Sequence, residues 1–492
     1  MIWLVSILLI VALSTIFVKW RFSYWKRKRI LCIEPTSIFG SVGNPITKKR
    51  NQGFVYADYY KKFKQEGARH GGFYNMLTAY YVPVDLDVIK HILETDFDCF
   101  YERGFYYNDK DDPVSAHLFA LGGEKWKTLR AKLSPAFTRA KTKTMFATIM
   151  QCAENMVGAL DTSYSAGRPI DAKDITSRFA IDVIGSCALG LECNSFENDK
   201  AEFVRISKLM FSRSGRFEVL VATFARNFPG LARALRIKAV GTEISKFYMD
   251  VARGTILYRR KNGVRRNDAF QALVDLGDDI TVEEIAAQCL AFFVAGYETS
   301  SSTLTFALYE LAKNVDVQRK TREEVLRVMS QHDGILTYEA IEKMKYLGQV
   351  VDETLRMYPP ITNFSRECTK DYKLPNSDIV IERGTRIVFP VMGIHHDEDY
   401  YPNPEKFDPN RFSDENRKKI KPFSYIPFSE GPRMCIGKRF GLMEVKIGLS
   451  VLLKNYSFVV NPNVPRTLSW NRFSLTLVST DIIWLDLTKA SA

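Results

Sequence analysis

The segment Phe428-Ser-Glu-Gly-Pro-Arg-Met-Cys-Ile-Gly437 decides how the rest of this 492-residue chain is interpreted. Gly431 and Gly437 let the backbone around Cys435 turn tightly and approach a ligand closely. Apolar residues then recur at helical spacing over 436–453, which predicts a helix that begins beside the cysteine. A helix N-terminus favours negative charge and lowers a thiol pKa. The segment therefore predicts a thiolate held against a metal, in preference to the alternative of an inert buried cysteine.

This segment resembles the haem-binding loop of the cytochromes P-450, F-x-x-G-x-R-x-C-x-G, at every fixed position. The resemblance implies that Cys435 is the axial thiolate of haem iron, a ligand that favours O–O bond cleavage. It also implies that Arg433 meets a haem propionate, that Phe428 packs near the sulfur and that Gly437 lines the cofactor, haem b. One departure is Ser429, where many members carry a second glycine; serine suits most turn geometries, so we expect little consequence.

The fold class follows from periodicity and composition. The chain is 46% hydrophobic and 25% charged, as globular proteins are, and no linker or repeat divides it after residue 50. Residues 87–355 are mostly helical in pattern, whereas Phe73 to Val84, 378–390 and 473–486 have strand character. We expect a mainly α protein with a small β subdomain, which by resemblance is the cytochrome P-450 fold. Eight cysteines without C-x-x-C spacing suit a reducing compartment.

The N-terminus predicts a membrane anchor. Residues 2–18 carry no charge, and as a helix they would span roughly 26 Å. Trp20 and Trp25 are expected at the membrane interface. Six cations lie between Lys19 and Arg29 without an acidic residue, which places the body of the protein in the cytosol. A cleaved signal peptide is the alternative, but its charge would precede the apolar stretch.

Three segments are therefore expected. Residues 1–29 form a single-span transmembrane anchor with its basic flank, residues 30–50 form a hinge, and residues 51–492 form the catalytic domain. The resemblance is closest to the microsomal branch that holds the vertebrate drug-metabolising enzymes, which implies the endoplasmic reticulum membrane. Nucleic-acid binding is excluded because the basic residues are not gathered beside a known binding motif.

An ion triad is expected behind the cysteine loop. Glu353 and Arg356 lie three residues apart on one helical face, so their side chains can meet. Considered alone, they would be an exposed surface pair of little consequence. In the family this pair joins an arginine of a later loop, here Arg411 in Phe407–Phe412, with Asn410 where a glutamate is common. Because three buried charges are costly unless paired, we expect the triad to fix the cysteine loop.

A proton relay is expected on a long helix that starts at a capping box of Thr281 and Glu284. The sequence Ala-Gly-Tyr-Glu-Thr, from Ala295 to Thr299, interrupts this helix, and its glycine invites a local bulge. A plain Ser/Thr-rich helix face is the alternative. The resemblance implies that Ala295 borders the haem, that Thr299 organises proton delivery and that Glu298 is the acid behind it.

Further cofactor contacts are implied at three positions. Trp126 and Arg130 share a helical face, and the family's W-x-x-x-R contacts the haem propionates. A core tryptophan with a solvated arginine is the alternative. Arg366 matches another propionate-contacting arginine of the microsomal branch. The sequence His395-His396-Asp397 matches a structural motif of the family, and we expect no catalytic role for it.

The electron source must be a second protein. The chain has no G-x-G-x-x-G motif and no P-loop. The resemblance implies the membrane-bound NADPH–cytochrome P-450 reductase, with cytochrome b5 as a second candidate. An acidic partner would meet cations around the cysteine loop. The candidates are Lys125, Lys127, Lys132, Lys438 and Arg439. The alternative is that these side chains are simply solvated.

The expected activity is that of a haem-thiolate monooxygenase that uses O2 and two electrons to oxidise, typically hydroxylate, a lipophilic xenobiotic, steroid or fatty-acid-like substrate. A haem-thiolate isomerase or peroxide-driven enzyme and a non-catalytic haem sensor are the alternatives. Glu298 and Thr299 favour the monooxygenase. The substrate pocket is expected from five segments: Asp112–Phe119, the phenylalanine-rich Phe203–Phe228, Phe292 with Ala295, Ile361–Phe364 and Arg472–Leu475.

Overall fold

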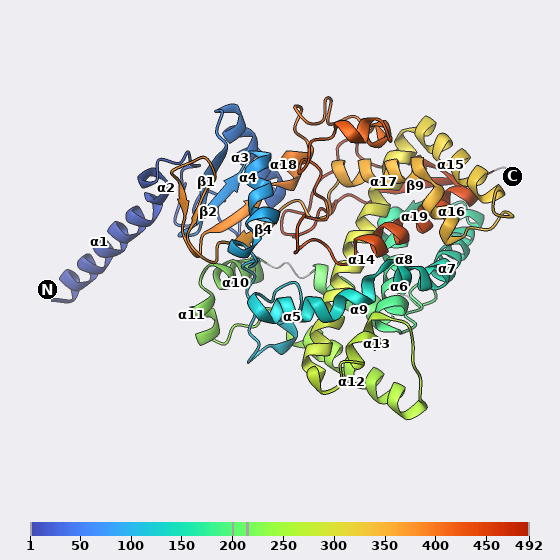
Figure 1. The fold of residues 1–492 in the computed structure, drawn as a ribbon, viewed down its shortest axis with the longest axis horizontal. Helices are drawn as coiled ribbons and strands as arrows, with labels where there is room; N and C mark the ends of the chain where they lie inside the picture. The colour runs from blue at the N-terminus through green and yellow to red at the C-terminus, as the bar shows by residue number, and fades with distance from the viewer. Residues whose placement is uncertain (1, 199–200, 213–215, 491–492) are drawn as a thin grey trace.

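The computed structural model describes residues 2–198, 201–212 and 216–490, and it is mainly helical with small sheets, as predicted (Figure 1). The first helices, up to the central one, are α1 Ile2–Phe22, α2 Tyr24–Arg27, α3 Gln52–Gln65, α4 Leu86–Lys90, α5 Gly123–Leu133, α6 Arg139–Thr144, α7 Phe146–Ser165, α8 Ala172–Ile184, α9 Glu202–Ser212, α10 Arg216–Asn227, α11 Pro229–Ala234, α12 Thr242–Asn262 and α13 Ala269–Val274. The remaining helices are α14 Val282–Lys313, α15 Val315–Ser330, α16 Tyr338–Lys343, α17 Lys345–Met357, α18 Val391–His395 and α19 Lys438–Asn455.

The strands form one sheet of four, one of three and one of two. The four-stranded sheet has the order β1-β2-β7-β4, in which only β2 and β7 pair in parallel. The strands of the three sheets are β1 His70–Asn75, β2 Thr78–Pro83, β7 Arg386–Phe389 and β4 Phe364–Glu367; β3 Ile170–Asp171, β9 Trp484–Lys489 and β8 Tyr456–Val460; and β5 Tyr372–Lys373 and β6 Val380–Ile381.

The strand predictions were right in part. Residues 73–83 of the predicted 73–84 fall in the β1–β2 hairpin, which turns at Met76 with φ 50°. The prediction at 473–486 is mostly wrong, because regular pairing there starts only at Trp484. Strand β8 was missed because it follows α19 without a break at Tyr456, so the apolar helical pattern runs straight into it.

Helix α14 lies at the centre of the larger hydrophobic core and is seen crossing the middle of the molecule in Figure 1. Its capping box is confirmed: Glu284 N donates to Thr281 Oγ1 at 3.2 Å, and Thr281 N donates to the Glu284 carboxylate at 2.8 Å. The predicted bulge is wrong, because α14 is one uninterrupted α-helix. Gly296 instead permits close packing, since a side chain there would collide with Ile184 of α8.

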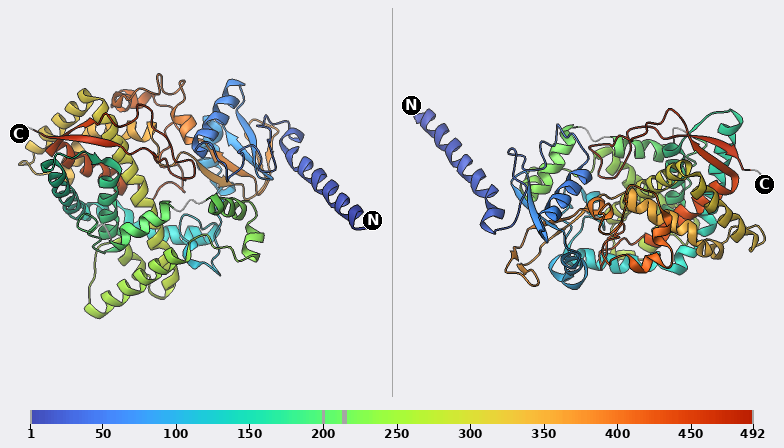
Figure 2. Two further views of the ribbon diagram at one scale, coloured as in Figure 1. Left: turned by 180° about the vertical axis from the view of Figure 1, so that it is seen from behind. Right: turned by 90° about the horizontal axis from the view of Figure 1, so that it is seen from above.

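A second core surrounds β1 and β2, next to the N-terminal helix. Helix α1 projects from the body in all three views of Figures 1 and 2, and none of its described residues is buried. It is long and apolar enough to cross a membrane.

The interfacial role predicted for Trp25 is wrong, whereas Trp20 is 53% exposed. Trp25 is only 2% exposed. Its indole Nε1 donates to the carbonyl of Phe73 at 3.2 Å, so this ring belongs to the core under β1. The following residues pair with the same strand, since Ile33 N donates to Gly72 O and Ser41 N to Tyr74 O, both at 2.8 Å.

Candidate functional site

The cysteine loop closes on itself just before α19. Cys435 N donates to the carbonyl of Phe428 at 2.9 Å. Gly431 has φ 74°, and a side chain there would collide with the backbone carbonyl of Leu93, so only glycine fits. Ser429 has φ 59°, a left-handed conformation in which serine is uncommon. The departure from glycine therefore has a conformational cost, contrary to our expectation.

The thiol of Cys435 lies three residues before α19, whose first residue is Lys438. Burial raises the pKa of the Cys435 thiol, while the Gly437 N–H and the charges of Arg103 and Arg130 oppose this. The lowering of the thiol pKa that we predicted from the helix N-terminus is thus outweighed by the effect of burial. The side chain nevertheless retains accessible surface. A group surrounded by protein and still accessible borders an internal space.

Arginines gather beside this thiol. Arg433 and Arg366 are each 1% exposed. Arg433 donates through Nε to Tyr101 O at 2.9 Å and through Nη2 to Leu121 O at 2.6 Å, and its guanidinium lies 4.0 Å from the Trp126 ring centre. Its Nη1 has no partner among the described residues. The structure thus brings Trp126 and Arg433 together, a contact that the sequence did not predict.

Arg366 reaches the cysteine loop from β4. Its Nη2 donates to Ser429 Oγ at 3.2 Å, which gives the unusual serine a function, and its Nε has no partner in the described parts of the chain. Burial and the charges of Arg103 and Arg433 hold the pKa of Arg366 well below its usual range. For Arg433, burial and neighbouring cations lower the pKa to about 9.

Arg103 was missed by the sequence analysis, and no motif or spacing marks it. Its Nη2 donates to Arg433 O at 2.9 Å, and its guanidinium lies 4.0 Å from the Phe119 ring centre. Burial lowers its pKa to about 10, while the charge of Cys435 acts in the opposite sense. Arg130 is half-buried, and burial lowers its pKa as well. Arg103 and Arg130 therefore interact with the charge of Cys435, while Arg366 and Arg433 belong to or contact its loop and each keep one N–H without a partner among the described residues. A group with carboxylates would neutralise this arrangement.

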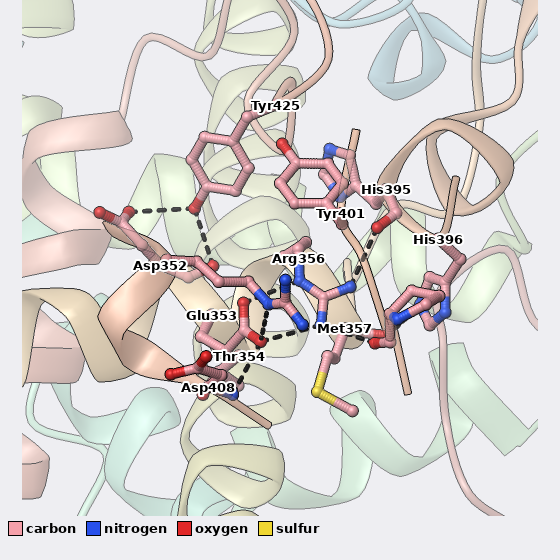
Figure 3. Close-up of polar contacts among 12 residues, drawn as sticks. Asp352, Glu353, Thr354, Arg356, Met357, His395, His396, Tyr401, Asp408 and Tyr425 are labelled. Atoms are coloured by element: carbon pink, nitrogen blue, oxygen red, sulfur yellow. Dashed lines mark hydrogen bonds and ion pairs between the residues drawn. The ribbon is translucent and has the colours of Figure 1, made fainter. Parts of the chain in front are cut away.

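The predicted ion triad is present, and its Glu353–Arg356 pair is drawn in Figure 3. Arg356 donates to both oxygens of Glu353, at 2.7 and 2.9 Å, and Arg411 Nε reaches Glu353 Oε1 at 3.3 Å. Glu353 and Arg356 are fully buried, so this is not a surface pair. Asp408 N, at 3.0 Å, completes the bonds to the carboxylate. Such full pairing is what makes a buried ion cluster tolerable.

His395 links the triad to the cysteine loop. Arg356 Nη1 donates to His395 O at 3.0 Å, and the Nε2 atom of His395 accepts from Ile426 N at 2.9 Å. Burial and the charge of Arg356 lower the pKa of His395 to about 3, so the ring is neutral and can accept. Ile426 lies two residues before Phe428. The expectation of a structural role is consistent with these contacts.

One face of α14 is accessible although the helix crosses the core. Ala295 is exposed and Thr299 is partly exposed, one turn apart, while their neighbours Phe293 and Tyr297 are buried. The Thr299 hydroxyl donates to the carbonyl of Ala295. This face therefore presents a small side chain and a hydroxyl to an internal space.

Glu298 points away from Thr299 toward α8. Its Oε1 accepts from Lys173 Nζ at 2.9 Å and from Ser302 Oγ at 3.2 Å. Lys173 also donates to Ser301 Oγ at 2.9 Å. Lys173 was missed by the sequence analysis, although a lysine in the first turn of a helix opposes the dipole and was the available signal.

The remaining predicted residues include buried core side chains, an exposed phenylalanine and surface cations. Phe203 and Phe292 are buried in the main core, and Phe203 packs 5.5 Å from Phe293, so it belongs to the core rather than to an apolar roof. Phe217 is 73% exposed. Three of the predicted docking cations have acidic neighbours at the surface: Lys125 with Asp109, Lys127 with Glu124 and Lys132 with Asp279.

A mainly helical fold around one central helix, with a cysteine loop and a buried glutamate–arginine pair behind it, defines the haem-thiolate class. The family model for cytochrome P450 matches residues 37–484, and the chain belongs to this family. Its members are monooxygenases that bind haem b, and redox partners and lipophilic substrates are common to them. The donor set fits that group, since a thiol suits iron and unpartnered guanidinium N–H groups suit propionates.

Curated relatives match along nearly their whole length. Probable cytochrome P450 6a14 of Drosophila melanogaster is 41% identical over 489 residues, which are 95% of this chain and 96% of the relative. Cytochrome P450 6a8 of the same species is 39% identical, covering 97% and 96%. Cytochrome P450 6A1 of Musca domestica is 39% identical, covering 93% and 94%.

Proposed function

We propose that this protein is a membrane-anchored monooxygenase that takes two electrons from the NADPH-dependent cytochrome P450 reductase and oxidises a lipophilic small molecule. The main support for a haem site is the group of arginines near Cys435. Two of them, Arg366 and Arg433, are buried and each have an N–H group without a partner among the described residues. Haem supplies the iron chemistry of oxygen activation when bound.

Cys435 would hold the haem iron through its thiolate sulfur. Arg433 and Arg366 would hold the propionates through their free Nη1 and Nε atoms, with Trp126 and Arg130 beside them. Phe428 and Gly437 bracket the sulfur: the first accepts from the Cys435 backbone, and the second donates to the thiol. Apart from the adjoining chain, no described residue comes within 4 Å of where a side chain on Gly437 would begin, so the approach on that side is open. Glu353, Arg356 and Arg411 hold the loop in place through His395.

Thr299 and Glu298 are the proposed proton-handling pair. Thr299 offers a hydroxyl on the accessible face of α14, and Ala295 one turn earlier leaves room beside it. Glu298 is buried against Lys173, and a rotation of its side chain would be needed to bring the carboxylate to the Thr299 face. Lys173 is therefore a positioning residue that holds the Glu298 carboxylate through an ion pair of 2.9 Å.

The membrane attachment and the redox partner are inferred from the N-terminus and the surface charge. Helix α1 suits a single membrane span, and the cations that follow it favour a cytosolic body in the endoplasmic reticulum membrane. We place the anchor at residues 1–29, the hinge at 30–50 and the catalytic domain at 51–492. Lys438 and Arg439, at the start of α19, adjoin the cysteine loop and suit an acidic electron donor, either the reductase or cytochrome b5.

Replacement of Thr299 by alanine tests this function. With reductase and a lipophilic substrate, the wild-type protein should consume NADPH and form an oxidised product. Thr299→Ala should keep haem binding and NADPH consumption but divert reducing equivalents to peroxide, because the hydroxyl that organises the protons is gone. Unchanged coupling of product to NADPH would contradict the relay. NADPH consumption absent with every ligand would instead favour the isomerase, peroxide-driven or sensor alternatives.

A further inference from the structure

Helices α14 and α19 carry different parts of the candidate site. Helix α14 presents Ala295 and Thr299 to the internal space, and α19 begins three residues after Cys435. The position of the Thr299 hydroxyl relative to the thiol therefore depends on how these two helices pack. A residue that fixes the register of α14 against α19 would also fix the proposed relay relative to the cysteine loop.

Glycines on one face of α19 bring the two helices close together. A side chain on Gly448 would come within 3.1 Å of Leu304 of α14, and one on Gly441 would lie 3.9 Å from Ser300 Oγ. Residues seven apart share one face of a helix, so both glycines face α14. Glu444 lies between them on the same face, three residues after Gly441 and four before Gly448.

One hydrogen bond joins α14 to α19 in the described parts of the chain. Ser300 Oγ donates to Glu444 Oε2 at 2.7 Å. Both side chains are buried, with Ser300 5% and Glu444 1% exposed. Ser300 directly follows Thr299 in the sequence. The bond therefore fastens α19 to α14 right beside the hydroxyl that the proposed reaction uses.

The buried carboxyl is not explained by stability. Only burial and the Ser300 hydroxyl act on the pKa of Glu444, and burial raises it to about 8, so the carboxyl is mostly neutral at pH 7. Its Oε1 has no partner among residues 2–198, 201–212 and 216–490. The thiols of Cys152 and Cys187 are the other titratable groups that interact with it. A buried polar atom without a partner costs free energy, and fixing a register is the best-attested use of such a group.

We propose that Glu444 is a positioning residue, which holds the Thr299 hydroxyl in register with the Cys435 loop through its hydrogen bond to Ser300. This inference rests on the proposed monooxygenase function and deepens it by naming what sets the relay. Without the bond, α14 would still pack on α19 through Leu304, but no directional contact would fix their register. A displacement of about 1 Å remote from the chemistry can cost about a hundredfold in rate. The expected defect is leakage of reducing equivalents to peroxide with the cofactor still held.

Four variants of the full-length, haem-loaded protein test the proposal. Ser300→Ala and Glu444→Met remove the hydrogen bond with little change in volume, and each should lower product formed per NADPH by about fivefold or more. The double variant should be no worse than either one, because a single interaction is lost in all three. Glu444→Gln should keep the wild-type yield, since a neutral amide accepts from Ser300 as the neutral carboxyl does. The carbon monoxide spectrum of the reduced protein and the half-saturating substrate concentration should not change.

Hydrogen exchange gives a second readout, which needs no turnover. The backbone amides of 295–303 should exchange at least about fivefold faster in Ser300→Ala and Glu444→Met, and at the wild-type rate in Glu444→Gln. Ser450→Ala is the matched control, because Ser450 is a buried serine of α19 whose hydroxyl contacts Met344 Sδ at 3.4 Å instead of α14. This control should change neither the yield nor the exchange of 295–303.

Wild-type yield and exchange in Ser300→Ala would overturn the proposal, as would a loss in Glu444→Gln equal to that in Glu444→Met. Loss of the carbon monoxide spectrum together with the yield would assign the pair to cofactor retention and would also overturn it. If Glu444→Met does not fold, Ser300→Ala and Glu444→Gln carry the test. The proposed function fails separately: a protein that consumes no NADPH with any ligand, yet shows faster exchange in Ser300→Ala, contradicts that function and leaves the register role standing.

Discussion

At the scale of single residues, the distinctive feature is four arginines beside one thiol. Arg366 and Arg433 are recognisable from sequence because each sits in a motif of the family. Arg103 is recognisable only in space, since it approaches from the segment before α5 and its guanidinium caps the Arg433 carbonyl. A sequence pattern reports spacing along one element, whereas this cluster is assembled from the region around residue 103, β4 and the cysteine loop.

Arg103→Gln should weaken haem retention. Removing one partly buried charged donor of the cluster should speed haem transfer to an acceptor protein by at least about tenfold, in line with about 1.5–3 kcal/mol for a hydrogen bond to a charged group. Arg139→Gln, which removes an equally charged but exposed side chain, serves as the control. Equal haem loss from both variants would contradict a role for Arg103 at the cofactor.

Glu444 makes stability depend on pH. This carboxyl of α19 is 1% exposed, accepts from Ser300 Oγ of α14 at 2.7 Å, and burial raises its pKa from 4.5 to about 8. The folded state therefore holds a proton that the unfolded chain releases above pH 4.5. The resulting contribution to stability is fully present below that pH and is lost as pH rises through 8.

Glu444→Gln should remove this dependence, because the amide keeps the contact with Ser300 and does not titrate. The variant should gain stability over the wild type between pH 5 and pH 8, by up to about 1.4 kcal/mol per pH unit, and the gain should vanish toward pH 4.5. Denaturant unfolding of both proteins across this range measures the difference. A constant offset between the two curves would show that Glu444 is ionised in the folded protein.

At the scale of elements, the contact between α8 and α14 positions the proposed relay. The length, capping box and apolar face of α14 were predictable, because local hydrogen bonds and periodicity fix them. The bulge prediction failed because Gly296 serves packing against Ile184, a contact with another element. Strand β8 was missed for a similar reason: its partner β9 lies some thirty residues further along the chain.

Lys173→Gln should lower coupling without loss of cofactor. The neutral amide cannot form the ion pair that positions Glu298, so product formed per NADPH should fall by about tenfold or more, within the range for general acid–base groups. Lys246→Gln, on the exposed face of α12, is the matched control. A reduced yield that comes with lost haem would indicate a structural role instead.

At the scale of the whole molecule, a second core ties the N-terminal segment to the body. The anchor helix was predictable from its uncharged run, but the position of Trp25 was not, because amphipathic aromatics suit a membrane interface and a core equally well. The site was likewise hard to predict, because the triad, His395 and the cysteine loop lie on three stretches of sequence that only the fold brings together.

The most direct test of the account is the spectrum of the reduced protein with carbon monoxide. A thiolate ligand from Cys435 predicts absorption near 450 nm, the wavelength recorded in the family name. Cys435→Ser should lose this band, while Cys99→Ser, a partly exposed thiol elsewhere, should keep it. If Cys435→Ser retained the band near 450 nm, the ligand would be another residue and the account of the site would be wrong.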